Sequence, residues 1–177
     1  DKIIEDESNE IKSIENSLVQ ISNELYNKRV QVSDLLQQEI KKIFTLLSLD
    51  GSLIKFEFIK EEKLNNFGID NLLVLYSPSS KIDLKPLAKI ASGGEKSRIL
   101  LAIKSVFAKK NNLPTIIFDE IDSGTSGEIA ESIGFLMKEM SKKIQIISIT
   151  HLAQVASKGD FHFKVIKTNN NGNSSTN

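Results

Sequence analysis

A stripe of apolar residues runs through the first 49 positions of the sequence at heptad spacing. Its first members follow one another at intervals of 7, 3, 4, 3 and 4 residues: Ile4, Ile11, Ile14, Leu18, Ile21 and Leu25. The stripe resumes with a shift of one residue, as an insertion in a heptad repeat produces, at Leu36, Ile40, Ile43 and Leu47. Because neither Gly nor Pro interrupts it, the pattern predicts a long helix with a coiled-coil seam that needs a partner helix. The alternative is an amphipathic helix packed on its own domain.

After Asp50 and Gly51 the pattern changes to that of strands. Residues 53–59 alternate between apolar and polar, which predicts a half-buried strand. Residues 72–76 are continuously apolar and predict a more buried strand. We expect a polar connection over 61–66 and a turn over 77–80.

From residue 89 onward, segments with helical periodicity alternate with short apolar runs. Helices are expected over 94–110, 128–140 and 152–157, and strands over 115–118, 144–149 and 161–166. The run at 115–118 is typical of a parallel strand buried on both faces, and 144–149 is expected to be buried as well. This rhythm predicts an α/β sandwich with a parallel sheet. The Asn- and Ser-rich segment 168–177 is expected to be a flexible turn or frayed end.

Composition narrows the range of partners and chemistry. The 177 residues include 23 Lys plus Arg and 23 Asp plus Glu, so global charge indicates neither a nucleic acid nor a membrane. The absence of Cys excludes disulfides and thiolate chemistry, and two His argue against a His-rich metal site. We expect a cytoplasmic protein with no membrane partner, because no apolar run approaches the ~18 residues of a membrane span. The first residue is Asp1, so we expect a piece of a longer chain.

A glycine pair heads the helix expected over 94–110. Ser92, Gly93, Gly94 and Glu95 follow one another, and glycines let a backbone approach a ligand closely. The N-terminus of a helix offers unpaired N–H groups with partial positive charge, which suit a phosphate. The alternative is a capping box, with Ser92 as the N-cap and Glu95 completing it.

Polar residues also follow two of the expected strands. Asp119 and Glu120 end the run at 115–118, where one carboxylate can hold Mg²⁺ and its neighbour can orient an attacking water. Thr150 and His151 follow 144–149, and this His can donate a hydrogen bond to a phosphate oxygen. Because neighbouring parallel strands end at the same edge, we expect these residues to meet there. A solvated acidic turn and a structural His are the alternatives.

The order of these motifs is more specific than any one of them. Together they resemble the C-terminal half of an ABC-type ATPase head, over 91–98, 116–124 and 149–151. Further segments are similar to the RecN family, bacterial SMC-like ATPases of DNA double-strand-break repair, at 101–104, 119–127 and 150–156. The resemblance implies an α/β fold: the C-terminal lobe of an ABC/SMC-type P-loop ATPase head with a parallel sheet, preceded by a coiled-coil helix.

The resemblance also implies roles for the residues at the strand ends. Asp119 and Glu120 would end the Walker B strand, with Asp119 holding Mg²⁺ through water and Glu120 polarising the attacking water. Asp122 would be the D-loop aspartate, and His151 the switch histidine that contacts the γ-phosphate. ATP and Mg²⁺ are therefore the expected cofactors.

On the same resemblance, a homodimer sandwiches ATP between two heads. Ser92, Gly93, Gly94 and Glu95 would form the signature motif, which contacts the nucleotide bound on the opposite subunit. The phosphate-binding motif G-x-x-x-x-G-K-[ST] does not occur in the 177 residues, so this chain alone is expected to be inactive and to need an N-terminal P-loop lobe.

The expected division of the chain is a coiled-coil helix over 1–49, the head lobe over 50–167 and a tail over 168–177. DNA as a partner, and a place at the nucleoid, rest on the family resemblance alone. Two other functions stay open: a transporter nucleotide-binding subunit and a non-catalytic coiled-coil scaffold.

Overall fold

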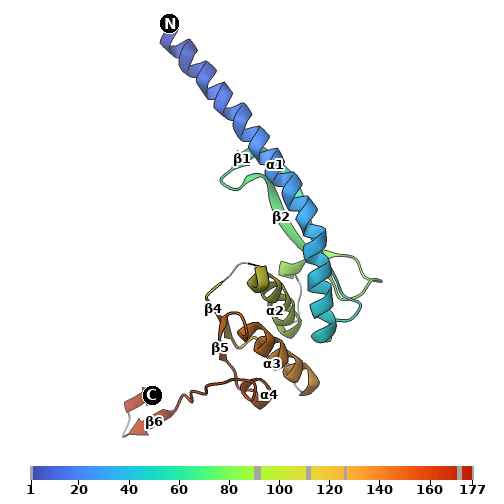
Figure 1. The fold of residues 1–177 in the computed structure, drawn as a ribbon, viewed down its shortest axis with the longest axis vertical. Helices are drawn as coiled ribbons and strands as arrows, with labels where there is room; N and C mark the ends of the chain where they lie inside the picture. Colours follow the sequence, from blue (N-terminus) through green and yellow to red (C-terminus); the bar gives the residue numbers. More distant parts are fainter. Residues whose placement is uncertain (1, 90–92, 111–112, 126, 171–172, 177) are drawn as a thin grey trace. The chain divides into compact units, whose positions relative to one another are not determined.

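The computed structural model describes residues 2–89, 93–110, 113–125, 127–170 and 173–176, and the chain forms two compact units, Asp1–Phe107 and Ala108–Asn177. The first unit begins with α1 (Lys2–Leu46), one uninterrupted helix, as the sequence predicts (Figure 1). Its last turns are buried, at Ile40, Ile43 and Phe44. The stripe residues from Ile4 to Leu25 are exposed, so the coiled-coil seam stays a prediction.

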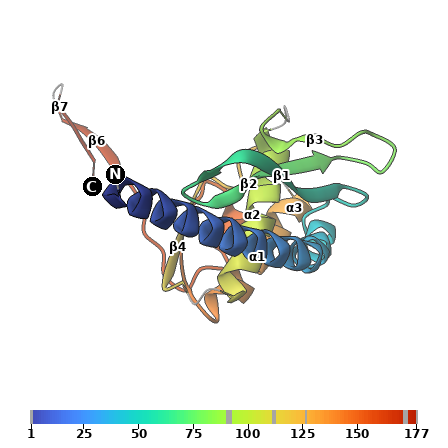
Figure 2. The same cartoon turned by 90° about the horizontal axis from the view of Figure 1, so that it is seen from above.

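A long antiparallel hairpin follows the helix. Strand β1 (Leu53–Asn65) pairs with β2 (Gly68–Ser77), and the short β3 (Lys85–Pro86) extends the sheet before a 3₁₀ turn, η1 (Leu87–Lys89). The hairpin lies alongside α1 (Figure 2). The polar connection expected over 61–66 is wrong, because β1 continues to Asn65. Its residues from 59 onward are exposed, so no burial alternation marks them as a strand.

Polar contacts fix the hairpin against the helix. The Arg29 guanidinium pairs with both carboxylate oxygens of Asp70, at 2.9 and 3.0 Å, and Asp70 is buried. Nearby, the Lys60 ammonium lies 4.6 Å from the centre of the Tyr26 ring, which also meets the Phe58 ring edge-on. Ion pairing and cation–π attraction therefore hold the outer half of the hairpin against α1, in a region where most residues of β1 are exposed.

The glycine pair opens α2 (Gly93–Lys110), which confirms the helix predicted there. Buried apolar residues of this helix include Ile99, Leu101, Ala102 and Val106. Their spacing covers one side of the helix, whereas Leu100 and Phe107 are exposed.

The second unit contains the parallel sheet that the sequence predicts. Strand β4 (Thr115–Asp119) pairs in parallel with β5 (Gln145–Ile149) through the connecting α3 (Gly127–Ser141), and the short α4 (Ala153–Ala156) follows. The buried side of α3 includes Ile133, Leu136, Met137 and Met140. A side chain at Gly134 would place Cβ only 3.0 Å from Lys158 Cγ and 3.1 Å from the Gln154 carbonyl oxygen. Gly134 therefore lets α4 pack closely against α3.

The expectation that both strands of this sheet are buried is wrong. Ile117 is 57% exposed, and Ile147 and Ile149 of the neighbouring strand are exposed on the same face. Phe118 is buried on the opposite face. Within the described ranges, one face of the sheet is therefore packed and the other is not covered.

The strand expected over 161–166 is also wrong: this segment has no ladder partner among the described residues, and Phe161, Phe163 and Val165 are exposed. Apolar alternation predicts a strand only where a packed surface lies on one side of it. The tail contains a hairpin of β6 (Lys167–Asn170) and β7 (Asn173–Thr176), and its expected flexibility stays a prediction. Of the helices described, none is long and apolar enough to cross a membrane.

Candidate functional site

The predicted catalytic residues of the second unit gather at one edge of its sheet. Asp119 pairs in register with Ile149, and the backbone N–H of Glu120 donates to the Ile149 carbonyl oxygen at 3.0 Å. His151 is two residues further along the chain, and its side chain is exposed. Parallel pairing therefore brings Asp119, Glu120 and His151 to the carboxyl ends of neighbouring strands, as expected from the sequence.

Glu120 has an unusual backbone conformation. Its φ angle is 46°, in the left-handed region that residues with a Cβ rarely occupy, at a cost of about 1–3 kcal/mol. The backbone N–H of Ser123 donates to the Glu120 carbonyl oxygen at 3.0 Å and closes a turn immediately after the strand. The turn redirects the chain away from the sheet and leaves the side chains of Asp119 and Glu120 exposed at its edge.

Asp122 occupies a different environment from these two carboxylates. It is only 1% exposed, and its Oδ2 accepts a hydrogen bond from the Thr150 hydroxyl. The Thr150 hydroxyl oxygen in turn accepts from the backbone N–H of Leu152 at 3.0 Å. Asp122 therefore joins the loop after β4 to the loop after β5. The residues of the second loop that take part, Thr150 and Leu152, flank His151 in the sequence. The D-loop role expected for it remains a prediction.

The second oxygen of this buried carboxylate is unusual. Asp122 Oδ1 has no hydrogen-bond partner in the part of the chain that the structure describes. A buried carboxylate oxygen without a donor is costly, so the bond to Thr150 is the main compensation that the described residues provide.

The predicted signature motif belongs to the first unit. Ser92 lies outside the described residues, while Gly93 and Gly94 are the first residues of α2. A Cβ added at Gly93 would meet nothing within 4 Å, so the backbone at the start of this helix faces open space. The carboxylate of Glu95 is turned toward the sheet, where its Oε1 accepts from the Tyr76 hydroxyl at 2.9 Å.

Sequence reasoning did not single out Tyr76, although the residue carries a visible clue. It ends an otherwise aliphatic run, and a buried Tyr brings a hydroxyl group that needs a partner. Burial raises the pKa of Tyr76 from 10.0 to about 12; the Glu95 carboxylate adds to this effect, and the Ser52 hydroxyl opposes it. The Tyr76 hydroxyl therefore keeps its proton and donates at neutral pH.

The donor set suits Mg²⁺ better than a metal held by protein ligands alone. Among the described residues there is no group of three or more His, Asp or Glu side chains that could hold a metal. Asp119 offers one exposed carboxylate at the sheet edge, next to that of Glu120. Mg²⁺ commonly keeps several waters and takes one or two carboxylates together with substrate phosphates, so this residue fits such an ion.

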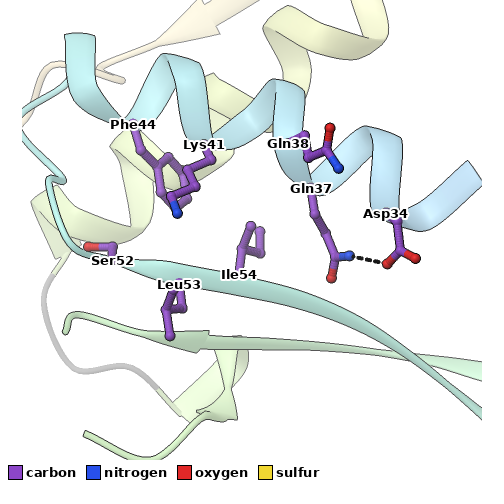
Figure 3. A pocket seen from close by; sticks show the side chains of 8 residues that line it. All are labelled: Asp34, Gln37, Gln38, Lys41, Phe44, Ser52, Leu53 and Ile54. Atoms are coloured by element: carbon purple, nitrogen blue, oxygen red, sulfur yellow. Dashed lines mark hydrogen bonds between the residues drawn. The ribbon is translucent and has the colours of Figure 1, made fainter. Parts of the chain in front are cut away.

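A hollow of about 280 Å³ lies in the first unit between the last turns of α1 and the start of β1 (Figure 3). It is lined by Asp34, Gln37, Gln38, Lys41, Phe44, Ser52, Leu53 and Ile54. None of the predicted site residues borders it, so it is separate from the nucleotide chemistry considered above.

The chain is similar to curated DNA repair proteins named RecN. It is 34% identical to RecN of Rickettsia felis over 165 residues, which cover 91% of this chain and 30% of the relative. It is 32% identical to RecN of Vibrio cholerae over 170 residues, covering 96% and 31%. The chain is a RecN-type sequence. It spans about 30% of the length of these relatives.

The fold of the chain is similar to solved structures of SMC heads. The chain matches a structure from work on ATP-driven dimerisation and DNA-stimulated activation of SMC ATPases, with a TM-score of 0.56 and 25% identity. That match covers 85% of this chain and 86% of the other. An Smc head with an extended coiled coil from Pyrococcus furiosus, bound to the C-terminal domain of ScpA, matches with a TM-score of 0.64 and 25% identity.

The second match covers 97% of this chain and 41% of the Smc chain. A search against protein-family models found no match. The α/β fold of an SMC-type head, predicted from the motifs, is thus confirmed for this RecN-type chain.

Proposed function

We propose that this RecN-type chain supplies the C-terminal part of an ATPase head that acts in DNA double-strand-break repair and recombination. The observation that carries the proposal is the meeting of Asp119, Glu120 and His151 at one sheet edge in a chain whose relatives are named as DNA repair proteins. The names of the relatives support the DNA repair part of this function, and the SMC ATPase title of a structural neighbour supports the ATPase part.

Each residue at the edge has a task that suits phosphoryl transfer. Asp119 would hold Mg²⁺ through water, and a bound Mg²⁺ supplies positive charge that offsets the phosphates. The Glu120 carboxylate would orient the attacking water and accept its proton. His151 would donate a hydrogen bond to the γ-phosphate. Phosphoryl transfer depends mainly on such positioning and charge stabilisation, so no covalent role for the protein is needed.

The remaining parts of the site come from elsewhere in the assembly. A P-loop lobe would cradle the phosphates, and the signature residues Gly93 and Gly94 of a second subunit would close over the nucleotide. The open space in front of Gly93 and the partial positive charge of a helix N-terminus support this placement. Because the donors are divided between two subunits, hydrolysis would depend on dimerisation, and nucleotide state could bias the geometry of the coiled coils.

The test is the variant Glu120→Gln in the full-length protein that contains this chain. The variant should retain ATP-dependent dimerisation but hydrolyse ATP at least ~100-fold more slowly, because the amide cannot accept the water's proton. Dimerisation is measured by light scattering and hydrolysis by phosphate release, with and without linear DNA. The matched control is Glu128→Gln, at an exposed carboxylate in the first turn of α3.

The control should behave like the parent in both assays. Hydrolysis by Glu120→Gln at the parental rate would remove Glu120 from the reaction. A parent that neither dimerises with ATP nor hydrolyses it would favour the scaffold alternative. Stimulation by a membrane partner in place of DNA ends would favour a transporter subunit.

A further inference from the structure

Tyr76 joins three segments of the first unit. Its hydroxyl donates to Glu95 Oε1 at 2.9 Å and lies 2.9 Å from the Ser52 hydroxyl oxygen. Its ring meets that of Phe44 edge-on, with ring centroids 6.2 Å apart and planes at 76°. Phe44 is in the last turn of α1, Ser52 begins the return from that helix, and Glu95 is in the first turn of α2.

The direction of the hydrogen bonds follows from their donors. Tyr76 has one hydroxyl proton, and the ionised Glu95 carboxylate can only accept, so that proton belongs to the bond with Glu95. Of the two acceptors near the Ser52 hydroxyl, the Tyr76 oxygen at 2.9 Å is closer than the Pro78 carbonyl oxygen at 3.4 Å, so Ser52 donates mainly to Tyr76. Tyr76 is 1% exposed, so water does not compete strongly for its hydroxyl group. A hydrogen bond to a charged acceptor is stronger than one between neutral groups, so Glu95 is held firmly.

We propose that Tyr76 is a positioning residue that links the signature motif to the base of the long helix. This inference rests on the function proposed above, in which Gly93 and Gly94 engage ATP. Since Glu95 is in the same helical turn as the glycine pair, fixing its side chain fixes the turn that presents their N–H groups. The same hydroxyl is held from the side of α1, by Ser52 and by the packing of Phe44.

The link has a consequence in each direction. A change in the direction of α1 at its base would reach the signature motif through the Tyr76 side chain. Closure of the glycine pair on a nucleotide would reach α1 by the same contacts. A residue that only filled the core would need no hydroxyl, since Phe has almost the same shape as Tyr and buries the same ring.

The experiment compares Tyr76→Phe with the parent in the full-length protein. The variant should need about tenfold more ATP for half-maximal dimerisation and hydrolysis, in line with the loss of a charge-assisted hydrogen bond. Its hydrolysis rate at saturating ATP should stay within about twofold of the parent, since the residues at the sheet edge are untouched. Backbone hydrogen exchange over 93–98 should be faster in the variant with or without ATP.

The matched control is Tyr26→Phe, because the contacts of this ring with Phe58 and Lys60 do not depend on its hydroxyl group. It should leave ATP dependence and exchange over 93–98 unchanged. A second variant, Glu95→Ala, removes the half-buried acceptor of the same hydrogen bond. It should reproduce the effect of Tyr76→Phe. In the double variant, the loss of apparent ATP affinity, expressed as a free energy, should be smaller than the sum of the losses in the two single variants.

The outcomes separate this inference from the proposed function. If the parent dimerises with ATP and Tyr76→Phe does so at the same ATP concentration, the link is wrong. If the parent does not dimerise with ATP, the proposed function fails, and hydrogen exchange still decides the link. Unchanged exchange over 93–98 in both Tyr76→Phe and Glu95→Ala would overturn it.

Discussion

At the scale of single residues, the three acidic side chains at and just beyond the end of β4 differ in burial. Asp119 and Glu120 are exposed at the sheet edge, where a ligand can reach them, while Asp122 is buried and bonded to Thr150. The buried carboxylate therefore joins the two loops, and the exposed pair is accessible to a ligand. The strain at Glu120, with its φ of 46°, falls on a residue to which we assign chemistry.

The bond between Asp122 and Thr150 should be measurable as stability. In the 177-residue chain, Thr150→Val keeps the shape of the side chain but leaves a buried carboxylate without its donor. We expect the free energy of unfolding in urea to fall by about 1–3 kcal/mol. Thr150→Ser keeps the hydroxyl and should lose much less. Equal losses for the Val and Ser variants would show that the hydrogen bond contributes nothing.

The raised pKa of Tyr76 should be visible in an alkaline titration. The chain has two Tyr and no Trp, so the difference in absorbance near 295 nm between the parent and Tyr76→Phe isolates this residue. We expect that difference to lack a step at pH 10 and to rise near pH 12. A step near the usual value of 10.0 would mean that the hydroxyl is neither buried nor bonded to Glu95.

The same shift fixes the sign of the linked stability change. Between pH 10 and 12 the folded chain keeps the Tyr76 proton and the unfolded chain loses it. The contribution of Tyr76 is therefore fully present below pH 10 and is lost as the pH rises toward 12. The Phe variant should lack this part of the pH dependence.

Only some of these residue-level features could be predicted from the sequence. The meeting of Asp119 and His151 follows from a general rule about the ends of parallel strands. The burial of Asp122 depends on the register of β4 against β5, and the left-handed backbone at Glu120 depends on the turn that Ser123 closes. The first needs two segments placed in three dimensions, and the second is not marked in the sequence because Glu is not a residue type typical of left-handed positions.

At the scale of elements, α1 has two parts with different environments. Ile14 is 52% exposed and Ile43 is 5% exposed, although both belong to the apolar stripe. The lower, C-terminal part of the helix, around Ile43, packs on its own unit. The upper, N-terminal part, around Ile14, has an exposed apolar stripe. The structure therefore accounts for the packing of the lower part, and the coiled-coil proposal accounts for the upper part.

This contrast predicts different results from one substitution at two positions. In the 177-residue chain, Ile43→Ala should lower the free energy of unfolding by about 2–4 kcal/mol because it leaves a cavity. Ile14→Ala should change it by less than about 0.5 kcal/mol. In the full-length protein, Ile14→Ala should also lower stability, as a seam paired with a second helix requires. Equal small effects of Ile14→Ala in both proteins would contradict the coiled coil.

Element types were predictable where a segment packs on another part of the same chain, and less so elsewhere. The heptad stripe predicted the helix, and α3 has the buried side that its spacing indicates. The exposed end of β1 was missed because residues 61–65 bury neither face. The run at 161–166 misled because its apolar residues have no surface to cover within the described chain.

At the scale of the whole molecule, each of the two units has exposed apolar side chains among its described residues. They include those of the seam of α1 and of the sheet face that carries Ile117, Ile147 and Ile149. Uncovered apolar surface of this kind commonly marks an interface. This supports the proposal that the chain works together with a P-loop lobe and a partner helix.

The same proposal predicts that the 177-residue chain alone does not hydrolyse ATP. It has the sheet-edge carboxylates but no phosphate-binding loop in its sequence, so no group is available to cradle the β- and γ-phosphates. Phosphate release by the purified chain should equal that of its Glu120→Gln variant. Steady turnover that this substitution abolishes would show that the chain contains a complete site.

The central claim is that the glycine pair of one subunit and the acidic pair of another complete the same nucleotide site. Mixing two inactive full-length variants tests it most directly. Gly93→Asp blocks the signature side, where the chain itself leaves room for a side chain, and Asp119→Asn removes the carboxylate proposed to hold Mg²⁺. The measurement is the ATP hydrolysis rate of an equal mixture of the two variants. Each mixed dimer would contain one intact site, so the mixture should recover about one quarter of the parental rate. A mixture as inactive as either variant alone, despite confirmed mixed dimers, would contradict the account.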